Sequence, residues 1–194
     1  MVNTPSLVEF LNQAKFSVAI FDLDNTLIDL NVEWGPLKVF LKKKHEEMFG
    51  TPRDFTRLMV GLEDVQKEYG QDKYEFFSNL IGQWEIKAAR TRAVERKNQT
   101  NILRQLRQAG KNIAIFTGNY RESAEIALKR FGLLQSVDVI VGRCESPKLK
   151  PDPSGLQVIL AHFGIPPEDA VYVGDADVDR AAGEAAGIRT YLVS

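Results

Sequence analysis

Short apolar runs recur along the chain and predict its strands. Each run is brief, mostly aliphatic or aromatic, and bounded by polar residues, glycine or proline. Runs of this kind are typical of strands that are buried on both faces of a parallel sheet. The runs lie at residues 16–21, 112–116, 137–141, 170–173 and 189–193.

Amphipathic helical patterns alternate with these runs. Residues 98–109 place Ile102, Leu103 and Leu106 on one face, and Gly110 follows as a natural C-terminal cap. Strands and helices in alternation indicate βαβ units with right-handed crossovers. We therefore predict an α/β fold, a Rossmann-like parallel sheet with helices on both faces, which binds ligands beyond the carboxyl ends of its strands. The other helices are predicted at residues 121–131, 154–163 and 177–186.

One long segment interrupts the alternation. Between residues 31 and 97 no strand is expected, and the composition shifts to Lys, Glu, Phe and Gln. The segment directly follows the loop of the first strand, so we expect an all-helical cap above the carboxyl ends of the sheet. The predicted organisation is a core domain of residues 1–30 and 98–194 and a cap domain of residues 31–97. Helices are predicted in the cap at residues 32–49, 54–69 and 73–90.

Paired carboxylates follow the first strand. Asp22 and Asp24 are separated by one residue, and the strand period of two points them to the same side. Like charges this close repel each other unless a proton or cation intervenes, and Mg²⁺ prefers such oxygen ligands. One carboxylate is then suited to nucleophilic attack and the other to proton transfer. The alternative is an ordinary turn at the end of a strand, where Asp and Asn are common.

A second polar motif follows the second apolar run. Thr117, Gly118 and Asn119 stand where this strand ends and a helix begins. A hydroxyl and backbone N–H groups at a helix N-terminus favour a phosphate. The alternative is a Thr cap of the helix with Gly providing a tight turn.

Two more motifs carry charge near strand ends. Lys150 stands directly before Pro151 at a stiffened helix entry, where it could neutralise phosphate charge. Lys148 is the less favoured lysine, and both could instead be solvated loop residues. Helix capping explains one or two of the carboxylates after the 170–173 run, but not easily all three. These carboxylates are Asp175, Asp177 and Asp179.

The four motifs, in this order and with the helical cap after the first, resemble the haloacid dehalogenase superfamily of phosphatases. The resemblance covers essentially the whole chain. The overall size, the short helical cap and the motif set look like phosphoglycolate phosphatase and its relatives. The resemblance implies a phosphatase that hydrolyses a small-molecule phosphate monoester with Mg²⁺ through a phospho-aspartate.

The resemblance also implies a role for each matched residue. Asp22 is the nucleophile, and Asp24 protonates the leaving oxygen and then activates water. Mg²⁺ is held by Asp22, Asp175 and the main-chain carbonyl of Asp24. Asp179 supports the metal site or the lysine. The phosphate is bound by Thr117, Gly118, Asn119 and Lys150.

Other functions stay open at this point. A phosphomutase retains both carboxylates of the first motif, so it is an alternative to the phosphatase. A non-catalytic binding protein with an inherited fold is a second alternative. Asp177 and the basic run at Lys42–Lys44 receive no role, and the run is expected to be a solvated helix face.

Composition limits the partners. Of 194 residues 44% are apolar and 26% charged, as in ordinary globular proteins, and the net charge of −1 demands neither nucleic acid nor an anionic membrane. The single cysteine, Cys144, cannot close an internal disulfide. Residues 1–15 lack a signal-peptide pattern, and no apolar run is long enough to span a membrane. We expect a cytoplasmic protein, monomeric or weakly dimeric, whose partner is a small phosphorylated metabolite.

Overall fold

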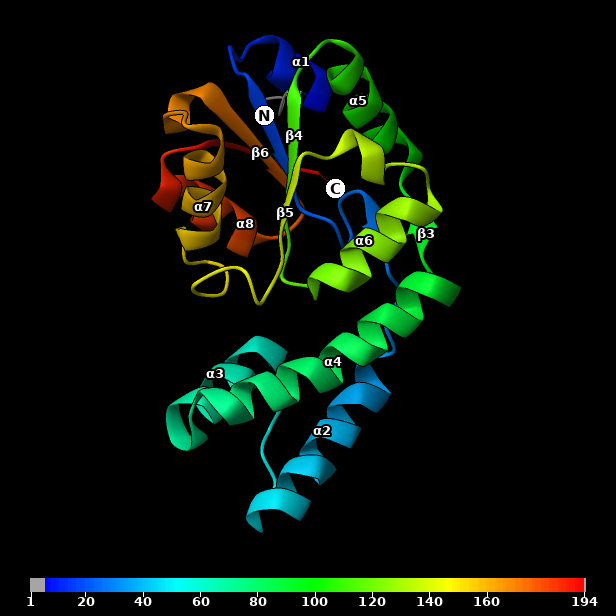
Figure 1. The fold of residues 1–194 in the computed structure, drawn as a ribbon, viewed down its shortest axis with the longest axis vertical. Coiled ribbons are helices and arrows are strands. Elements are labelled where there is room, and N and C mark those ends of the chain that lie inside the picture. Colours follow the sequence, from blue (N-terminus) through cyan, green and yellow to red (C-terminus); the bar gives the residue numbers. More distant parts are fainter. Residues whose placement is uncertain (1–5, 194) are drawn as a thin grey trace, which may run out of the picture.

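The structure, a computed structural model, describes residues 6–193. Its main sheet has the strand order β5-β4-β1-β6-β7, and every neighbouring pair is parallel (Figure 1). The predicted α/β fold is confirmed. Residues 1–5 and 194, which belong to the predicted core domain, lie outside the described residues. The strands are β1 (Val18–Phe21), β4 (Asn112–Phe116), β5 (Val139–Val141), β6 (Ala170–Gly174) and β7 (Arg189–Leu192).

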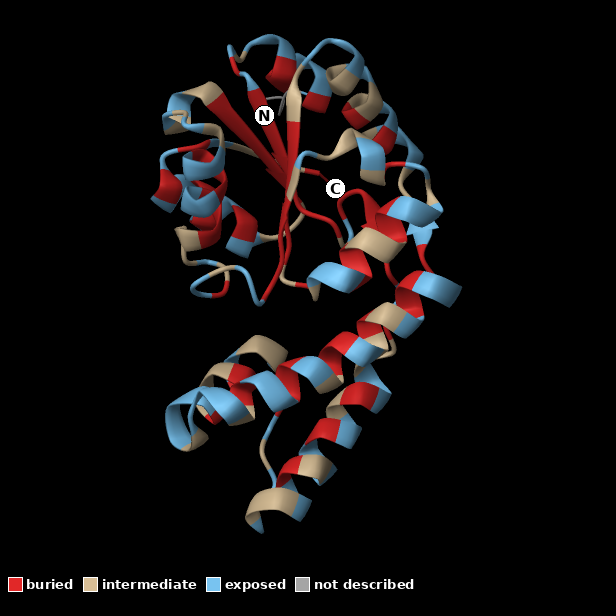
Figure 2. Ribbon diagram, viewed as in Figure 1, coloured by how far each residue is buried: buried red, intermediate tan, exposed pale blue. Residues whose placement is uncertain are grey.

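Helices cover both faces of this sheet. Alternate strand residues belong to different apolar clusters: Ala19 and Phe21 pack with α1, α5 and α6, whereas Val18 and Ile20 pack with α7 and α8. Strands β1, β4 and β6 are accordingly almost completely buried in the middle of the molecule (Figure 2), whereas β7, at one edge of the sheet, is partly exposed. The helices are α1 (Leu7–Asn12), α5 (Lys97–Gln108), α6 (Arg121–Arg130), α7 (Ser154–Phe163) and α8 (Asp177–Ala186), with short 3-10 turns η1 (Leu134–Ser136) and η2 (Pro167–Asp169).

The segment after β1 leaves the sheet and forms three helices, α2 (Trp34–Phe49), α3 (Leu58–Tyr69) and α4 (Gln71–Thr91). They lie beyond one end of the sheet (Figure 1). Helix α3 begins later than the predicted residue 54. The Asp54 carboxylate accepts hydrogen bonds from the amide and hydroxyl of Thr56, a local pairing that competes with helix formation.

One prediction about the elements was wrong, and one helix had not been predicted. No strand was expected between residues 31 and 97, yet β3 (Val94–Glu95) pairs antiparallel with β2 (Ile28–Asp29) where the segment leaves and rejoins the sheet. Helix α1 was also not predicted. Strands β2 and β3 are only two residues long, which is too short to show a periodicity. Helix α1 is also short, with six residues, and begins with a capping box formed by Ser6 and Glu9.

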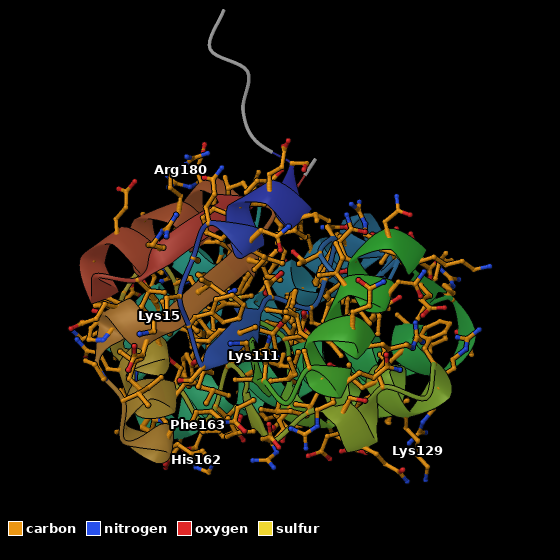
Figure 3. All side chains as sticks on the ribbon, turned by 90° about the horizontal axis from the view of Figure 1, so that it is seen from above. Lys15, Lys111, Lys129, His162, Phe163 and Arg180 are labelled. Carbon is orange, nitrogen blue, oxygen red and sulfur yellow. The ribbon has the colours of Figure 1, made fainter. Side chains whose placement is uncertain are left out.

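The two ends of the sheet differ in what they face. Figure 3 views the molecule from the end opposite α2–α4, where Lys111 stands just before β4 and donates a hydrogen bond to the carbonyl of Phe16. The carboxyl ends of the strands therefore point toward α2–α4 (Figure 1). Among residues 6–193, no helix combines the length and the apolar composition needed to cross a membrane.

Candidate active site

Three adjacent strands at the centre of the sheet deliver the predicted site residues. Asp22 follows β1, Thr117 follows β4 and Asp175 follows β6. Strand β1 pairs with β4 on one side and with β6 on the other, so the three residues emerge at one edge. These residues are up to 153 positions apart in the sequence. The main-chain hydrogen bonds of the sheet bring them together in a fixed register.

Asp22 is buried and held on both carboxylate oxygens. Its Oδ1 accepts from Nζ of Lys150 at 2.7 Å, and its Oδ2 lies 3.5 Å from the hydroxyl of Thr26. The same hydroxyl lies 3.3 Å from Oδ1 of Asp175. Thr26 was not predicted as a site residue. The available signal was its spacing, because Asp22, Asp24 and Thr26 continue one alternation along the chain.

The chain turns sharply after the paired carboxylates. Asn25 has φ of 59°, a left-handed conformation that Asn adopts more readily than most residues. Oδ1 of Asp24 accepts a hydrogen bond from the main-chain N–H of Leu30 at 2.8 Å, whereas Oδ1 of Asp22 accepts one from Lys150. The two carboxylates of the first motif therefore have different surroundings.

Lys150 is enclosed by charge and by aromatic rings. Its Nζ donates to Asp22 and to Asp179, at 2.7 Å each, and lies 4.7 Å and 5.4 Å from the ring centres of Phe116 and Tyr172. Only 9% of the side chain is exposed, whereas that of Lys148 is 74% exposed. Of the two lysines, Lys150 therefore belongs to the site, and Lys148 pairs with Asp152 on the surface.

Asp179 anchors the lysine from the start of α8. Its Oδ1 accepts from Lys150 and from the hydroxyl of Tyr172 at 2.6 Å, and its Oδ2 accepts the amides of Asp175 and Ala176. A Cβ added at Gly174 would lie 2.5 Å from Cβ of Asp179, so only glycine lets α8 approach the strand end this closely. Tyr172 is a second member of the site that the sequence pattern did not reveal.

The carboxylates at the site can hold a divalent cation. Oxygens of Asp22, Asp175 and Asp179 lie within 4.8 Å of one another. Each oxygen of Asp179 already accepts two hydrogen bonds, so no lone pair is left for a cation. Within the described part of the chain, each oxygen of Asp22 accepts only one, and Asp175 accepts one from Thr26, so these two carboxylates have spare lone pairs. The main-chain carbonyl of Asp24 accepts no hydrogen bond from any residue in the range 6–193. This oxygen-only donor set fits a hard cation such as Mg²⁺.

Burial dominates the electrostatics of these groups. It raises the pKa of Asp22, opposed by the Lys150 ammonium and reinforced by Asp179. Burial also raises the pKa of Asp24 to about 6, with a hydrogen bond from Leu30 opposing it. The pKa of Asp175 is raised by burial and then by Asp179. Carboxylates that resist ionisation in this way are stabilised by a bound cation.

The predicted phosphate loop is buried and internally bonded. Thr117 donates its hydroxyl to Oδ1 of Asn119 at 2.8 Å and accepts the amide of Asn119 at 3.2 Å. A Cβ on Gly118 would meet nothing within 4 Å, so open space adjoins this residue. The side-chain Nδ2 of Asn119 donates to Oε1 of Glu85 on α4 at 3.2 Å. Glu85 was not predicted to contribute.

The residues without a predicted role stay outside this cluster. Asp177 is exposed at the start of α8. In the basic run, Lys42 and Lys43 are exposed and Lys44 pairs with Glu47 at 3.1 Å. The run therefore lies on a solvated face of α2, as expected.

Comparison with known proteins decides the family. The haloacid dehalogenase-like hydrolases match residues 19–193, which is nearly the whole chain. This protein is a haloacid dehalogenase-like hydrolase. The family, the fold and the hydrolase activity predicted from the motifs are thereby confirmed.

Relatives of this hydrolase carry names of phosphatases. Pyrophosphatase PpaX of Bacillus velezensis is 27% identical over 191 residues, covering 93% of this chain and 84% of the relative. Phosphoglycolate phosphatase of one Cereibacter sphaeroides strain is 40% identical over 90 residues, 46% of this chain and 40% of the relative. The prediction of a phosphatase within this superfamily agrees with these names.

A solved structure shares the architecture of the hydrolase. CbbY from Rhodobacter sphaeroides, determined in complex with phosphate, superposes with a TM-score of 0.66 at 18% identity. The match covers 90% of this chain and 84% of CbbY. At this identity the likeness establishes the fold and not the substrate.

Proposed function

We propose that this chain is a Mg²⁺-dependent phosphatase that hydrolyses a small-molecule phosphate monoester through a phospho-aspartate at Asp22. The observation that carries the proposal is the fixed carboxylate of Asp22, bonded to Lys150 on one oxygen and to Thr26 on the other. A nucleophile needs such a fixed line of attack. In this proposal residues 1–30 and 98–194 act as the catalytic core and residues 31–97 as the cap.

In the first half-reaction, an oxygen of Asp22 attacks the phosphorus and the bond to the ester oxygen breaks. The departing oxygen takes a proton from Asp24, whose pKa is raised by burial, which favours the acid form needed for this transfer. The Lys150 ammonium, the Thr117 hydroxyl and the main-chain N–H of Gly118 stabilise the phosphoryl oxygens. The products of this step are the free alcohol and phosphorylated Asp22.

In the second half-reaction, Asp24 is a carboxylate and removes a proton from water. The water oxygen attacks the phosphorus, the bond to Asp22 breaks, and inorganic phosphate leaves. Asp22 is restored as a carboxylate and Asp24 as an acid, so the protons balance over the cycle. The hydrogen bond from the main-chain N–H of Leu30 holds the carboxyl of Asp24 in one position through both steps.

Asp22, Asp175 and the main-chain carbonyl of Asp24 would hold the Mg²⁺, because their oxygens are the ones with spare lone pairs. When bound, the cation supplies positive charge that offsets the crowded carboxylates and the phosphate. Asp179 does not ligate in this proposal and instead positions Lys150, because its oxygens are already used.

The proposal is tested by phosphate release from a panel of small phosphate esters. The names of the relatives make pyrophosphate and 2-phosphoglycolate the first compounds to include. We expect release with Mg²⁺, loss after rigorous chelation and recovery on adding Mg²⁺ back. A phosphomutase would interconvert phosphate esters with little free phosphate, and a binding protein would do neither. Full release after complete metal removal would contradict the proposal.

A further inference from the structure

Helix α4 lies on the α/β layers through one regular face. Ser78, Gly82, Glu85 and Ala89 are buried and recur at helical spacing. A Cβ added at Gly82 would lie 2.9 Å from Cγ of Tyr120, so the helix backbone rests directly on the residue after the phosphate loop. Helix α4 therefore cannot pack closer to Tyr120. Its buried polar residues on this face, Ser78 and Glu85, need hydrogen-bond partners in the elements that they face.

Glu85 uses both carboxylate oxygens for partners outside its own helix. Its Oε1 accepts a hydrogen bond from the side-chain Nδ2 of Asn119 at 3.2 Å, and its Oε2 accepts one from the main-chain N–H of Tyr120 at 2.8 Å. The guanidinium of Arg143 donates to both oxygens, at 2.8 Å and 3.2 Å. Both side chains of this ion pair are 0% exposed.

Arg143 holds the same loop from the other side. Its Nη1 donates to the carbonyl of Gly118 at 2.9 Å, and its main-chain N–H donates to the carbonyl of Asn119 at 2.9 Å. Its Nε and Nη2 donate to the hydroxyl and carbonyl of Ser78 on α4, at 2.9 Å and 3.1 Å. The loop from 117 to 119 is thus clamped between a residue of α4 and a residue that follows β5.

Stability alone does not account for such a pair. A buried ion pair gains little over well-packed apolar residues of the same volume, because both charges must be stripped of water. Here, however, every polar contact is directed at Ser78 or at the residues from 118 to 120. The geometry of the pair is therefore matched to holding one loop in one place.

We propose that Glu85 and Arg143 are positioning residues through which α4 sets the place of the loop at residues 117–119 for phosphoryl binding. Helix α4 then acts together with the catalytic core, although it lies within residues 31–97. The inference rests on the proposed function, in which this loop binds the phosphate.

Four variants, compared with the wild type in Mg²⁺, separate positioning from structural support. Glu85→Gln leaves a buried guanidinium unpaired. The double variant Glu85→Gln/Arg143→Met carries no unpaired charge and lacks the guanidinium that bonds residue 85, Ser78 and the carbonyl of Gly118 together. Arg143→Lys keeps the charge but cannot bond Glu85, Ser78 and Gly118 together. Glu75→Gln makes the same carboxylate-to-amide change at an exposed site on α4 and is the matched control.

The measurements are the melting temperature, the calorimetric affinity for inorganic phosphate, and kcat and KM for an activated aryl phosphate. We expect Glu85→Gln to lose melting temperature and phosphate affinity together. The double variant should regain most of the melting temperature, while its phosphate affinity and kcat stay lower by about tenfold or more, since small misplacements of positioned groups cost rates of this order. Arg143→Lys should lose phosphate affinity with a smaller loss of melting temperature, and Glu75→Gln should match the wild type.

Two results would overturn the inference. One is a double variant that recovers wild-type phosphate affinity and kcat along with its melting temperature, because the pair would then be structural only. The other, decisive even when the double variant does not fold, is unchanged phosphate affinity in Arg143→Lys. A wild type that binds phosphate but hydrolyses no ester would refute the proposed function alone, because the phosphate affinities of the variants still decide the inference.

Discussion

At the scale of single residues, the site balances charge within a very small volume. Lys150 meets two carboxylates and two aromatic faces, and Asp179 meets four hydrogen-bond donors. Each of these two groups is therefore fixed by several partners at once. Preorganisation of this kind is what lets a side chain stabilise charge without reorganising during the reaction.

Lys150→Ala should cost far more activity than Lys148→Ala. Lys150 is enclosed beside Asp22, whereas Lys148 is largely exposed and its pairing with Asp152 is worth little in water. Removing one preorganised charge from such a site typically lowers the rate by about 10²–10³. Steady-state kinetics on both variants checks this. Equal and small effects would show that the wrong lysine has been assigned to the phosphate.

The response of stability to Mg²⁺ should depend on pH. Burial raises the pKa of Asp22 from 3.8 to about 7, and it raises the pKa of Asp175 as well. A carboxyl with a raised folded-state pKa stabilises the fold at low pH, and this contribution is lost as pH rises through the raised pKa. The metal-free protein should therefore melt at a lower temperature at about pH 8 than at about pH 6.

Mg²⁺ should reverse that trend, because it replaces the lost protons. Added Mg²⁺ should raise the melting temperature more at about pH 8 than at about pH 6, where protons still compete for the same oxygens. Thermal melts with and without chelator at both pH values measure this. An equal Mg²⁺ effect at both pH values would mean that Asp22 and Asp175 are not the ligands.

The site residues that directly follow strands could be predicted from the sequence, but the residues that support them could not. Asp22, Thr117 and Asp175 were predicted to meet because parallel strands end at a common edge. Glu85 and Arg143 are 58 residues apart; Glu85 lies within α4, and Arg143 lies two residues after the end of β5. No local pattern announces a contact of this kind, because it depends on how α4 packs. Tyr172 was hidden for a similar reason, as its position reads as one more buried strand residue.

At the scale of elements, the alternation of strands and helices was readable because each element is bounded by glycine or a polar motif. Helices α7 and α8 begin and end at the predicted residues, and so does strand β4. The misses, α1, β2 and β3, are elements too short to show a period. The late start of α3 came from side-chain hydrogen bonds of Asp54 that compete with the helix.

The helical segment and the sheet share an apolar core. One cluster of buried residues contains Phe21 of β1, Leu128 of α6 and Phe77 of α4. Removing the helical segment would therefore expose apolar surface on α6 and the buried side chain of Arg143. This sharing sets a limit on how independent the cap can be.

Replacing residues 31–91 by a short linker should accordingly destabilise the remaining chain. Each Å² of apolar surface newly exposed costs about 25 cal/mol, and α4 covers much of α6. We expect a lower melting temperature and a tendency to associate, seen by circular dichroism and gel filtration. A relinked protein that is monomeric and melts like the full chain would show that the segment does not support the core.

At the scale of the whole molecule, the central claim is that Asp22 carries the phosphoryl group while Asp24 moves protons. Their surroundings differ: Asp22 is locked between Lys150 and Thr26, whereas Asp24 turns toward Leu30. Loss of either carboxylate should therefore stop turnover at a different step. Asp22→Asn cannot be phosphorylated, and Asp24→Asn can be phosphorylated but lacks the base that activates water.

Intact-protein mass spectrometry after a brief acid quench tests this claim most directly. With Mg²⁺ and an activated aryl phosphate, whose leaving group needs little protonation, Asp24→Asn should accumulate one phosphoryl group per chain. Asp22→Asn should show none under the same conditions. Labelling of Asp22→Asn but not of Asp24→Asn would reverse the two roles. No adduct on any form of an active enzyme would contradict the covalent mechanism and favour direct attack by water.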